Sequence, residues 1–199
     1  SPGSTRSSWM LRDLIASKKI QPHINVFGGE DRFWLGPEGG QFSIFFAPGA
    51  KFDLAHWFTP AALDTEPFAI VSQAADRVVC RRAIDLRNFS GTRLQLEATR
   101  EVRLLRAADA LTAHQLTLPA GVSAVAFESV NTVKNTGRDA WRKDTGLLSI
   151  WILGMFNASP SATVVAPFQP GPAATRGPEV NDAYFGKVPA DRLVVRDRR

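Results

Sequence analysis

The sequence predicts an all-β domain, a large antiparallel sandwich, from segments whose apolar residues follow strand periods. Residues 78–86 and 94–104 alternate apolar with polar side chains, and the turn-forming residues 88–92 join them. Alternate side chains of a strand lie on one face, so this pattern predicts a hairpin with one buried and one solvated face. Residues 125–133 alternate similarly, and the apolar run 147–156 predicts a further, buried strand. Many strands with few helical patterns favour an antiparallel sandwich.

The N-terminal segment shows helical spacing instead. Three apolar residues recur at helical intervals within residues 9–20, ahead of Pro22. Because a proline disfavours helical backbone in the residue before it, a short helix or an irregular arm is expected to end there.

A glycine-rich motif, GGEDRFWLGPEGGQ at residues 28–41, follows. It sets five glycines among charged residues and a tryptophan. Glycine lets the backbone bend tightly or approach a ligand closely. Alternating apolar residues at 24–26 and 42–46 predict a strand, a polar turn and a second strand. We therefore expect this motif to form a functional rim.

Two arginines interrupt the apolar face of the predicted hairpin. Arg82 and Arg100 share the phase of the apolar residues around them. A charge on such a face needs a partner or an opening. The sequence leaves two alternatives: each arginine lines a cleft, or each extends to water at a sheet edge.

The region that follows the predicted strands is dominated by loop-forming residues. Residues 159–178 are rich in Pro, Ala, Gly and Ser. This composition predicts loops around a sheet, with one short strand at 164–168.

Composition excludes several classes of protein. The 199 residues are 44% apolar, enough for one buried core, and the net charge of +5 is scattered, so nucleic-acid binding is not expected. Cys80 is the only cysteine, which excludes a disulfide framework or a thiolate cluster, and its apolar phase predicts burial. The run 147–156 is half of the roughly 20 residues that a membrane-spanning helix needs. The oligomeric state is left open.

Several cofactor and catalytic motifs are absent from the sequence. The glycine-rich motif lacks the Lys-Ser/Thr of a phosphate loop, and no Gly-x-Gly-x-x-Gly or Gly-x-Ser-x-Gly occurs. The three histidines show no metal-ligand spacing. We therefore expect no cofactor and no metal.

The charged and aromatic residues of the motif suit a carbohydrate. Sugars present flat C–H faces that pack on aromatic rings, and hydroxyl groups that need planar donors and acceptors. Aromatic residues in β-sandwiches more often belong to the core, so a core position for each tryptophan stays open as the alternative. The candidate ligand-binding residues are Glu30, Arg32, Trp34, Glu38, Gln41 and Trp57.

Four longer segments carry a family resemblance. They are HINVFGGEDRFWLGPEGGQFSIFF at residues 23–46, FTPAALDTEPF at 58–68, TGLLSIWILGMF at 145–156 and VNDAYFGKVPADRL at 180–193. They resemble a family of uncharacterised, mostly exported bacterial proteins with a galactose-mutarotase-like (aldose-epimerase-like) β-supersandwich fold. The similarity extends over residues 9–199. Members of that family are nearly twice as long, so the chain is expected to be a fragment containing their N-terminal and middle part.

The resemblance implies a fold, a ligand and a location. It implies an antiparallel β-supersandwich, incomplete in this fragment, with an N-terminal arm or short helix at residues 1–22 and a partial mutarotase-like domain at 23–199. It also implies a carbohydrate ligand and export to the periplasm or outside the cell, although the chain shows no signal peptide.

Mutarotation would require a proton acceptor and a proton donor. One group removes the proton of the anomeric hydroxyl and another protonates the ring oxygen. His56 is the candidate acid, with a structural histidine as the alternative. The resemblance implies a glutamate base in the C-terminal half that the fragment lacks. The histidine motifs of true aldose epimerases are not found at matching positions.

Three hypotheses on function follow. The chain is a carbohydrate-binding module, or part of a sugar-modifying enzyme of the mutarotase type, or a non-catalytic structural or interaction domain. The third hypothesis treats the glycine-rich motif as a self-contained turn, with Arg32 paired to Glu30 or Glu38, Trp34 buried and no cavity beside them.

Overall fold

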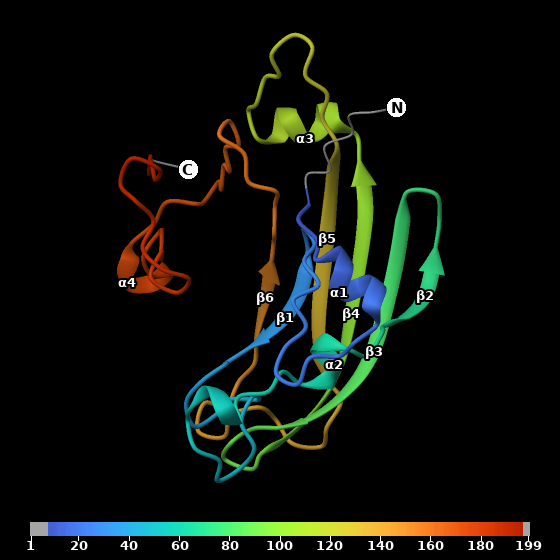
Figure 1. The fold of residues 1–199 in the computed structure, drawn as a ribbon, viewed down its shortest axis with the longest axis vertical. Helices are drawn as coiled ribbons and strands as arrows, with labels where there is room; N and C mark the ends of the chain where they lie inside the picture. Colours follow the sequence, from blue (N-terminus) through green and yellow to red (C-terminus); the bar gives the residue numbers. More distant parts are fainter. Residues whose placement is uncertain (1–7, 197–199) are drawn as a thin grey trace.

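The computed structural model describes residues 8–196, and this part of the chain is mostly β. Its strands form two antiparallel sheets (Figure 1), which confirms the all-β, antiparallel class. The strands are β1 (Arg32–Gly36), β2 (Ala69–Gln73), β3 (Arg77–Arg87), β4 (Arg93–Leu105), β5 (Ala126–Asn135) and β6 (Ser149–Leu153). The helices are α1 (Arg12–Ser17), the 3-10 turn η1 (Leu54–His56), α2 (Ala61–Asp64), α3 (Ala107–Ala113) and α4 (Ala173–Arg176).

The larger sheet has the strand order β2-β3-β4-β5 and is built on the predicted hairpin. β3 and β4 pair along the whole length of β3. Asn88 fixes the connection between them, because its Oδ1 accepts from the Thr92 N–H at 2.9 Å and its Nδ2 donates to the Thr145 carbonyl at 2.8 Å. The predicted hairpin and the predicted strand β5 are therefore confirmed.

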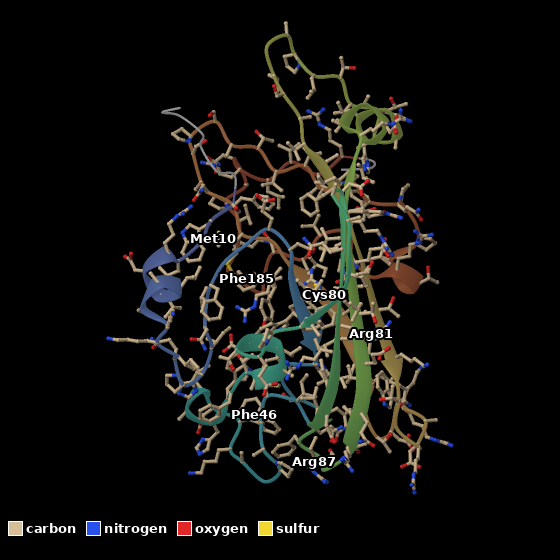
Figure 2. The ribbon with its side chains drawn as sticks, turned by 90° about the vertical axis from the view of Figure 1, so that its right-hand side faces the viewer. Met10, Phe46, Cys80, Arg81, Arg87 and Phe185 are labelled. Atoms are coloured by element: carbon tan, nitrogen blue, oxygen red, sulfur yellow. The ribbon has the colours of Figure 1, made fainter. Side chains whose placement is uncertain are left out.

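Alternation along the strands separates two faces of this sheet. Figure 2 shows β1 and α2 on one side of it, which we call the inner face. Buried residues of the inner face are Ile84, Leu94, Leu96 and Ala98, each at most 4% exposed. The opposite, outer face carries cross-strand ion pairs, among them Arg77–Glu101, Arg81–Glu97, Arg93–Asp85 and Arg103–Glu128.

The smaller sheet closes the core against the inner face. β1 pairs with β6 so that Trp34 lies opposite Trp151. Four successive residues of β1 are buried, as are four successive residues, 43–46, of the loop that follows it. The core therefore lies between β1, this loop and the inner face; its members outside the larger sheet are Phe33, Trp34, Leu35, Ile44, Phe45, Phe46 and Leu63.

The glycine-rich motif does not form the predicted strand, turn and strand. β1 runs through the middle of the motif, and residues 24–26 and 42–46 lie outside the strands. Ile44, Phe45 and Phe46 are all buried, whereas a strand with one buried face would bury alternate residues. Backbone hydrogen bonds outside any strand ladder hold this loop. For example, the Phe58 N–H donates to the Phe45 carbonyl at 2.9 Å. The prediction was wrong because core packing, and not strand pairing, positions these apolar residues.

The predicted strand at 147–156 exists but is not buried. β6 occupies its centre, and Ile150 and Ile152 are 41% and 44% exposed. The reason is that β6 belongs to a two-stranded sheet that packs on the core through one face only.

The predicted short strand at 164–168 is not present in the described residues. The region 159–178 contains the helix α4 and loops. Pro167, Pro170 and Pro172 lack the N–H group that a sheet ladder requires, so this region cannot extend a sheet.

The N-terminal arm packs beside β6. The helix α1 lies within the arm expected at residues 1–22, and the Trp9 N–H donates to the Met155 carbonyl at 3.0 Å. Residues 1–7 of that arm and residues 197–199 of the expected domain lie outside the described residues. Within residues 8–196, no helix combines the length and apolar character needed to cross a bilayer.

Candidate functional site

Two neighbouring cavities lie where the start of β1 meets the inner face. The first has a volume of about 380 Å³, and the second of about 370 Å³. Residues 27–33, Leu63, Asp64 and Arg100 line the first cavity. Asp31, Phe68, Cys80, Arg100, Val102 and Phe127 line the second. Both volumes fall within the roughly 300–1,000 Å³ range of small-molecule sites.

Two glycines shape the wall of the first cavity. Gly28 has a φ of +84° and Gly29 a φ of +108°. A Cβ at Gly28 would lie 2.3 Å from the Trp9 carbonyl oxygen, so only glycine fits between the N-terminal arm and the cavity. The Gly29 N–H donates to Trp9 O at 2.9 Å, and Gly29 O accepts from the Met155 N–H at 2.8 Å. The glycines thus let three distant segments meet at the cavity.

An ion pair between Arg32 and Asp64 forms one side of the first cavity. The Arg32 Nη2 lies 2.8 Å from Asp64 Oδ1, and the two side chains are 11% and 5% exposed. Asn25 completes the set, since its N–H and Nδ2 donate to Asp64 and its carbonyl accepts from Arg32 Nη1 at 2.8 Å. The guanidinium also lies over the Trp34 ring, 4.7 Å from the centroid. These contacts fix Arg32 in one orientation.

A second ion pair, Asp31–Arg100, separates the two cavities. Arg100 Nη2 donates to Asp31 Oδ2 at 2.7 Å and to the Asp31 carbonyl at 2.8 Å. Ser129 Oγ donates to Asp31 Oδ1 at 3.1 Å. The side chains of Arg100 and Asp31 are 17% and 15% exposed. Desolvation lowers the pKa of Arg100, and the neighbouring Asp31 carboxylate opposes this shift.

The two ion pairs begin at adjacent residues, Asp31 and Arg32, whose side chains point in opposite directions. Neighbouring residues of an extended segment point to opposite sides. Arg32 accordingly reaches Asp64 at the end of α2, while Asp31 reaches Arg100 on β4. The start of β1 is therefore held by charges on both sides, and both pairs contribute to the wall of the first cavity.

The inner face carries a polar row at the level of Asp31. The register aligns Cys80 with Arg100 and Arg100 with Asn131 across β3, β4 and β5. Arg100 Nε and Asn131 Oδ1 are buried and have no hydrogen-bond partner. Arg82 differs from Arg100, because it pairs with Glu66, donates to the Pro67 carbonyl at 2.7 Å and lines neither cavity. Of the two inner arginines, only Arg100 borders these cavities.

The structure divides the predicted ligand-binding residues into two groups. Glu30 and Arg32 line the first cavity. Trp34 is 1% exposed and lies in the core beneath Arg32, with its Nε1 donating to Glu38 Oε1 at 2.5 Å. The other oxygen of Glu38 accepts from Tyr184. A role of these residues in binding stays a prediction.

The remaining predicted residues line neither cavity. Gln41 is exposed, and its carbonyl accepts from Ser90 Oγ at 2.6 Å. Trp57 stacks on Phe45 with ring centroids 4.9 Å apart. His56 Nδ1 lies 2.5 Å from Asp53 Oδ1 in an exposed pair, and the hydrogen bond from His56 lowers the pKa of Asp53. The catalytic role predicted for His56 is not tested by this placement.

Three features of the site differ from the expectations. Asp64 was missed, although it lies in the segment 58–68 that carries part of the family resemblance. Arg32 pairs with Asp64 and not with Glu30 or Glu38. Cys80 lies on the inner face as its phase predicted, but it is half-buried because it borders the second cavity.

The arrangement provides hydrogen-bond donors and acceptors side by side. Carboxylates accept and guanidinium groups donate, so a ligand with hydroxyl groups could satisfy both. Within residues 8–196, no three His, Cys, Asp or Glu side chains form a group that could hold a metal ion.

Comparison with known proteins places the chain in a family. No curated protein and no solved structure matches it. Residues 3–199 match the model of a Family of unknown function (DUF6786), and the chain therefore belongs to this family.

Proposed function

We propose that this protein binds a carbohydrate in the first cavity. The observation that carries the proposal is the charged wall of this cavity, to which Glu30, Asp31, Arg32, Asp64 and Arg100 all contribute. A sugar hydroxyl both donates and accepts hydrogen bonds, so alternating carboxylate and guanidinium groups match it. The cavity volume of about 380 Å³ is adequate for a small organic ligand.

The wall is organised before a ligand arrives. Asp64 holds Arg32, and Asp31 holds Arg100, with distances of 2.8 and 2.7 Å. Binding then costs little side-chain ordering, which improves affinity for a given set of contacts. Gly28 and Gly29 contribute backbone to the cavity wall, and a Cβ at Gly28 would collide with the Trp9 carbonyl of the N-terminal arm.

We also propose that the protein has a galactose-mutarotase-like β-supersandwich fold and that it is exported. The four sequence segments quoted above support both, and the two antiparallel sheets are compatible with the fold. An exported protein with this fold would meet sugars outside the cytoplasm, which agrees with the proposed ligand.

Binding without catalysis is the version that the geometry favours. The enzyme hypothesis requires a histidine and a carboxylate facing each other across a cleft. Neither of the two cavities has a histidine in its wall, and the candidate His56 pairs with Asp53 elsewhere. A sugar-modifying activity of a longer protein would need a catalytic group from outside these two cavities.

The structural alternative is supported by one observation and opposed by two. Trp34 is buried, as a self-contained turn would require. Arg32, however, pairs with Asp64 outside the motif and not with Glu30 or Glu38. That hypothesis also requires that no cavity remain beside the motif, whereas the first cavity is lined by residues 27–33. The cavity is the reason to prefer a ligand.

Calorimetry with a panel of monosaccharides tests the proposal. We expect binding by the wild-type chain, weakened about tenfold or more in Glu30→Gln and Arg100→Lys, which alter charged donors and acceptors. Glu97→Gln, on the outer face of the same sheet, is the matched control and should bind like wild type. Circular dichroism checks folding of each variant. If no sugar binds the folded wild type, the proposal is rejected.

A further inference from the structure

The two cavities share part of their walls. Asp31 and Arg100 line both of them, while the other lining residues belong to one cavity only. A ligand in the first cavity therefore lies against the same ion pair that borders the second.

The chemistry of the second cavity differs from that of the first. Besides the shared ion pair and Cys80, its wall consists of Phe68, Val102 and Phe127. Phe127 is 42% exposed although it lies on the inner face. Covering a half-exposed ring with an apolar group removes apolar surface from water, which is favourable.

Phe68 connects this apolar surface to the core, because its ring contacts that of Phe33, but the part on β4 and β5 lies beyond the core residues. Along the inner face of β4, the buried residues Leu94, Leu96 and Ala98 come first, then Arg100, and then Val102 and Leu104. Arg100 and the polar row thus separate two apolar zones of the inner face, one at residues 94–98 and the other at residues 102–104. Leu104, at 56% exposure, lies opposite Phe127 in the register of β4 and β5. The second zone therefore stays open at the surface beside the second cavity.

We infer that the ligand is a glycoside with an apolar aglycone. The sugar ring occupies the first cavity, the aglycone occupies the second, and the Asp31–Arg100 pair lies beside the linkage between them. The inference rests on the proposed carbohydrate binding and adds the chemical class of the substituent. It fits the division of the walls, since charged groups surround one cavity and aromatic or aliphatic groups the other.

Cys80 offers a readout for the second cavity alone. It is the only cysteine of the chain, it is half-buried, and it borders the second cavity but not the first. Its rate of alkylation by iodoacetamide therefore reports whether a group fills the second cavity.

The experiment compares methyl and 4-nitrophenyl glycosides of the same hexoses. Calorimetry should show the 4-nitrophenyl glycosides binding about tenfold more tightly, because the aromatic ring buries additional apolar surface. At saturation they should slow alkylation of Cys80 severalfold, whereas methyl glycosides should not.

A pair of variants on β5 provides the control. Phe127→Ala should weaken 4-nitrophenyl glycosides about fivefold and leave methyl glycosides unchanged. Val130→Ala changes a residue of similar exposure, 43%, on the outer face of the same strand and should leave both unchanged.

The outcomes separate the inference from the proposed function. Equal affinities for the two series, with no protection of Cys80, would overturn the apolar aglycone and leave carbohydrate binding intact. Absence of binding by every glycoside would overturn both. Equal protection of Cys80 by 4-nitrophenol alone, without any sugar dependence, would also overturn the assignment of a glycoside.

Discussion

The two faces of the larger sheet contain the same kinds of ion pair in different surroundings. On the outer face, Arg93 and Asp85 are 58% and 49% exposed; on the inner face, Arg100 and Asp31 are 17% and 15% exposed. The hydrogen bond that Arg93 donates to Asp85 raises the pKa of Arg93, whereas desolvation lowers the pKa of Arg100. Water solvates each outer charge, so the outer charges gain little stabilisation from their partners. The inner charges are largely removed from water, so each is stabilised mainly by its partner. Burial, and not pair geometry, therefore decides which pairs organise the site.

Removing the more deeply buried carboxylate should cause the largest effect. Asp64→Ala leaves Arg32 without its ion-pair partner and Asn25 without three hydrogen bonds, so we expect a loss of about 4 kcal/mol in the free energy of unfolding. Urea denaturation followed by fluorescence measures it. Glu97→Gln on the outer face is the control, with no measurable loss; equal losses in both variants would contradict the difference between the faces.

Breaking the Asp31–Arg100 pair should cost somewhat less, because both side chains are more exposed. Arg100→Met leaves the Asp31 carboxylate with the Ser129 hydroxyl only, and we expect a loss of about 3 kcal/mol. The double variant Asp31→Asn/Arg100→Met should recover part of this loss, since no charge remains unpaired. Denaturation of the two single variants and the double variant completes the cycle; strictly additive losses would show that the pair is not coupled.

The outer face should respond to pH in a narrow acidic window. The hydrogen bond from Arg93 lowers the pKa of Asp85, and that from Arg77 lowers the pKa of Glu101. Carboxylates with a lowered folded-state pKa stabilise the fold above their unfolded pKa, near 4, and this contribution disappears as pH falls through the folded value. NMR titration should place both pKa values below those of free carboxyls. In Arg93→Ala, only the Asp85 pKa should return toward its ordinary value; an unchanged Asp85 pKa would show that the pair does not form in solution.

Local sequence patterns determined the hairpin and its faces. Alternation from residue 78 to residue 104 specified which side chains face the core, and it placed Arg82 and Arg100 on that side before any partner was known. This succeeds because the phase of burial in a strand is a property of neighbouring residues. The same reasoning failed for residues 42–46, whose successive apolar residues enter the core without forming a strand.

The tertiary structure decided which partners meet. Arg32 pairs with Asp64, 32 residues away in the sequence, and Arg100 pairs with Asp31, 69 residues away. The predicted pairs of Arg32 with Glu30 or Glu38 did not form. The tertiary structure also placed Trp34 in the core and left Arg100, but not Arg82, beside the cavities. The physical reason is that local periodicity specifies a direction for each side chain, whereas its partner depends on how distant segments pack together. For this protein the sequence alone therefore determined the β3–β4 hairpin with its inner arginines and the positions of β5 and β6, and packing of β1 and α2 against the sheet created the candidate site.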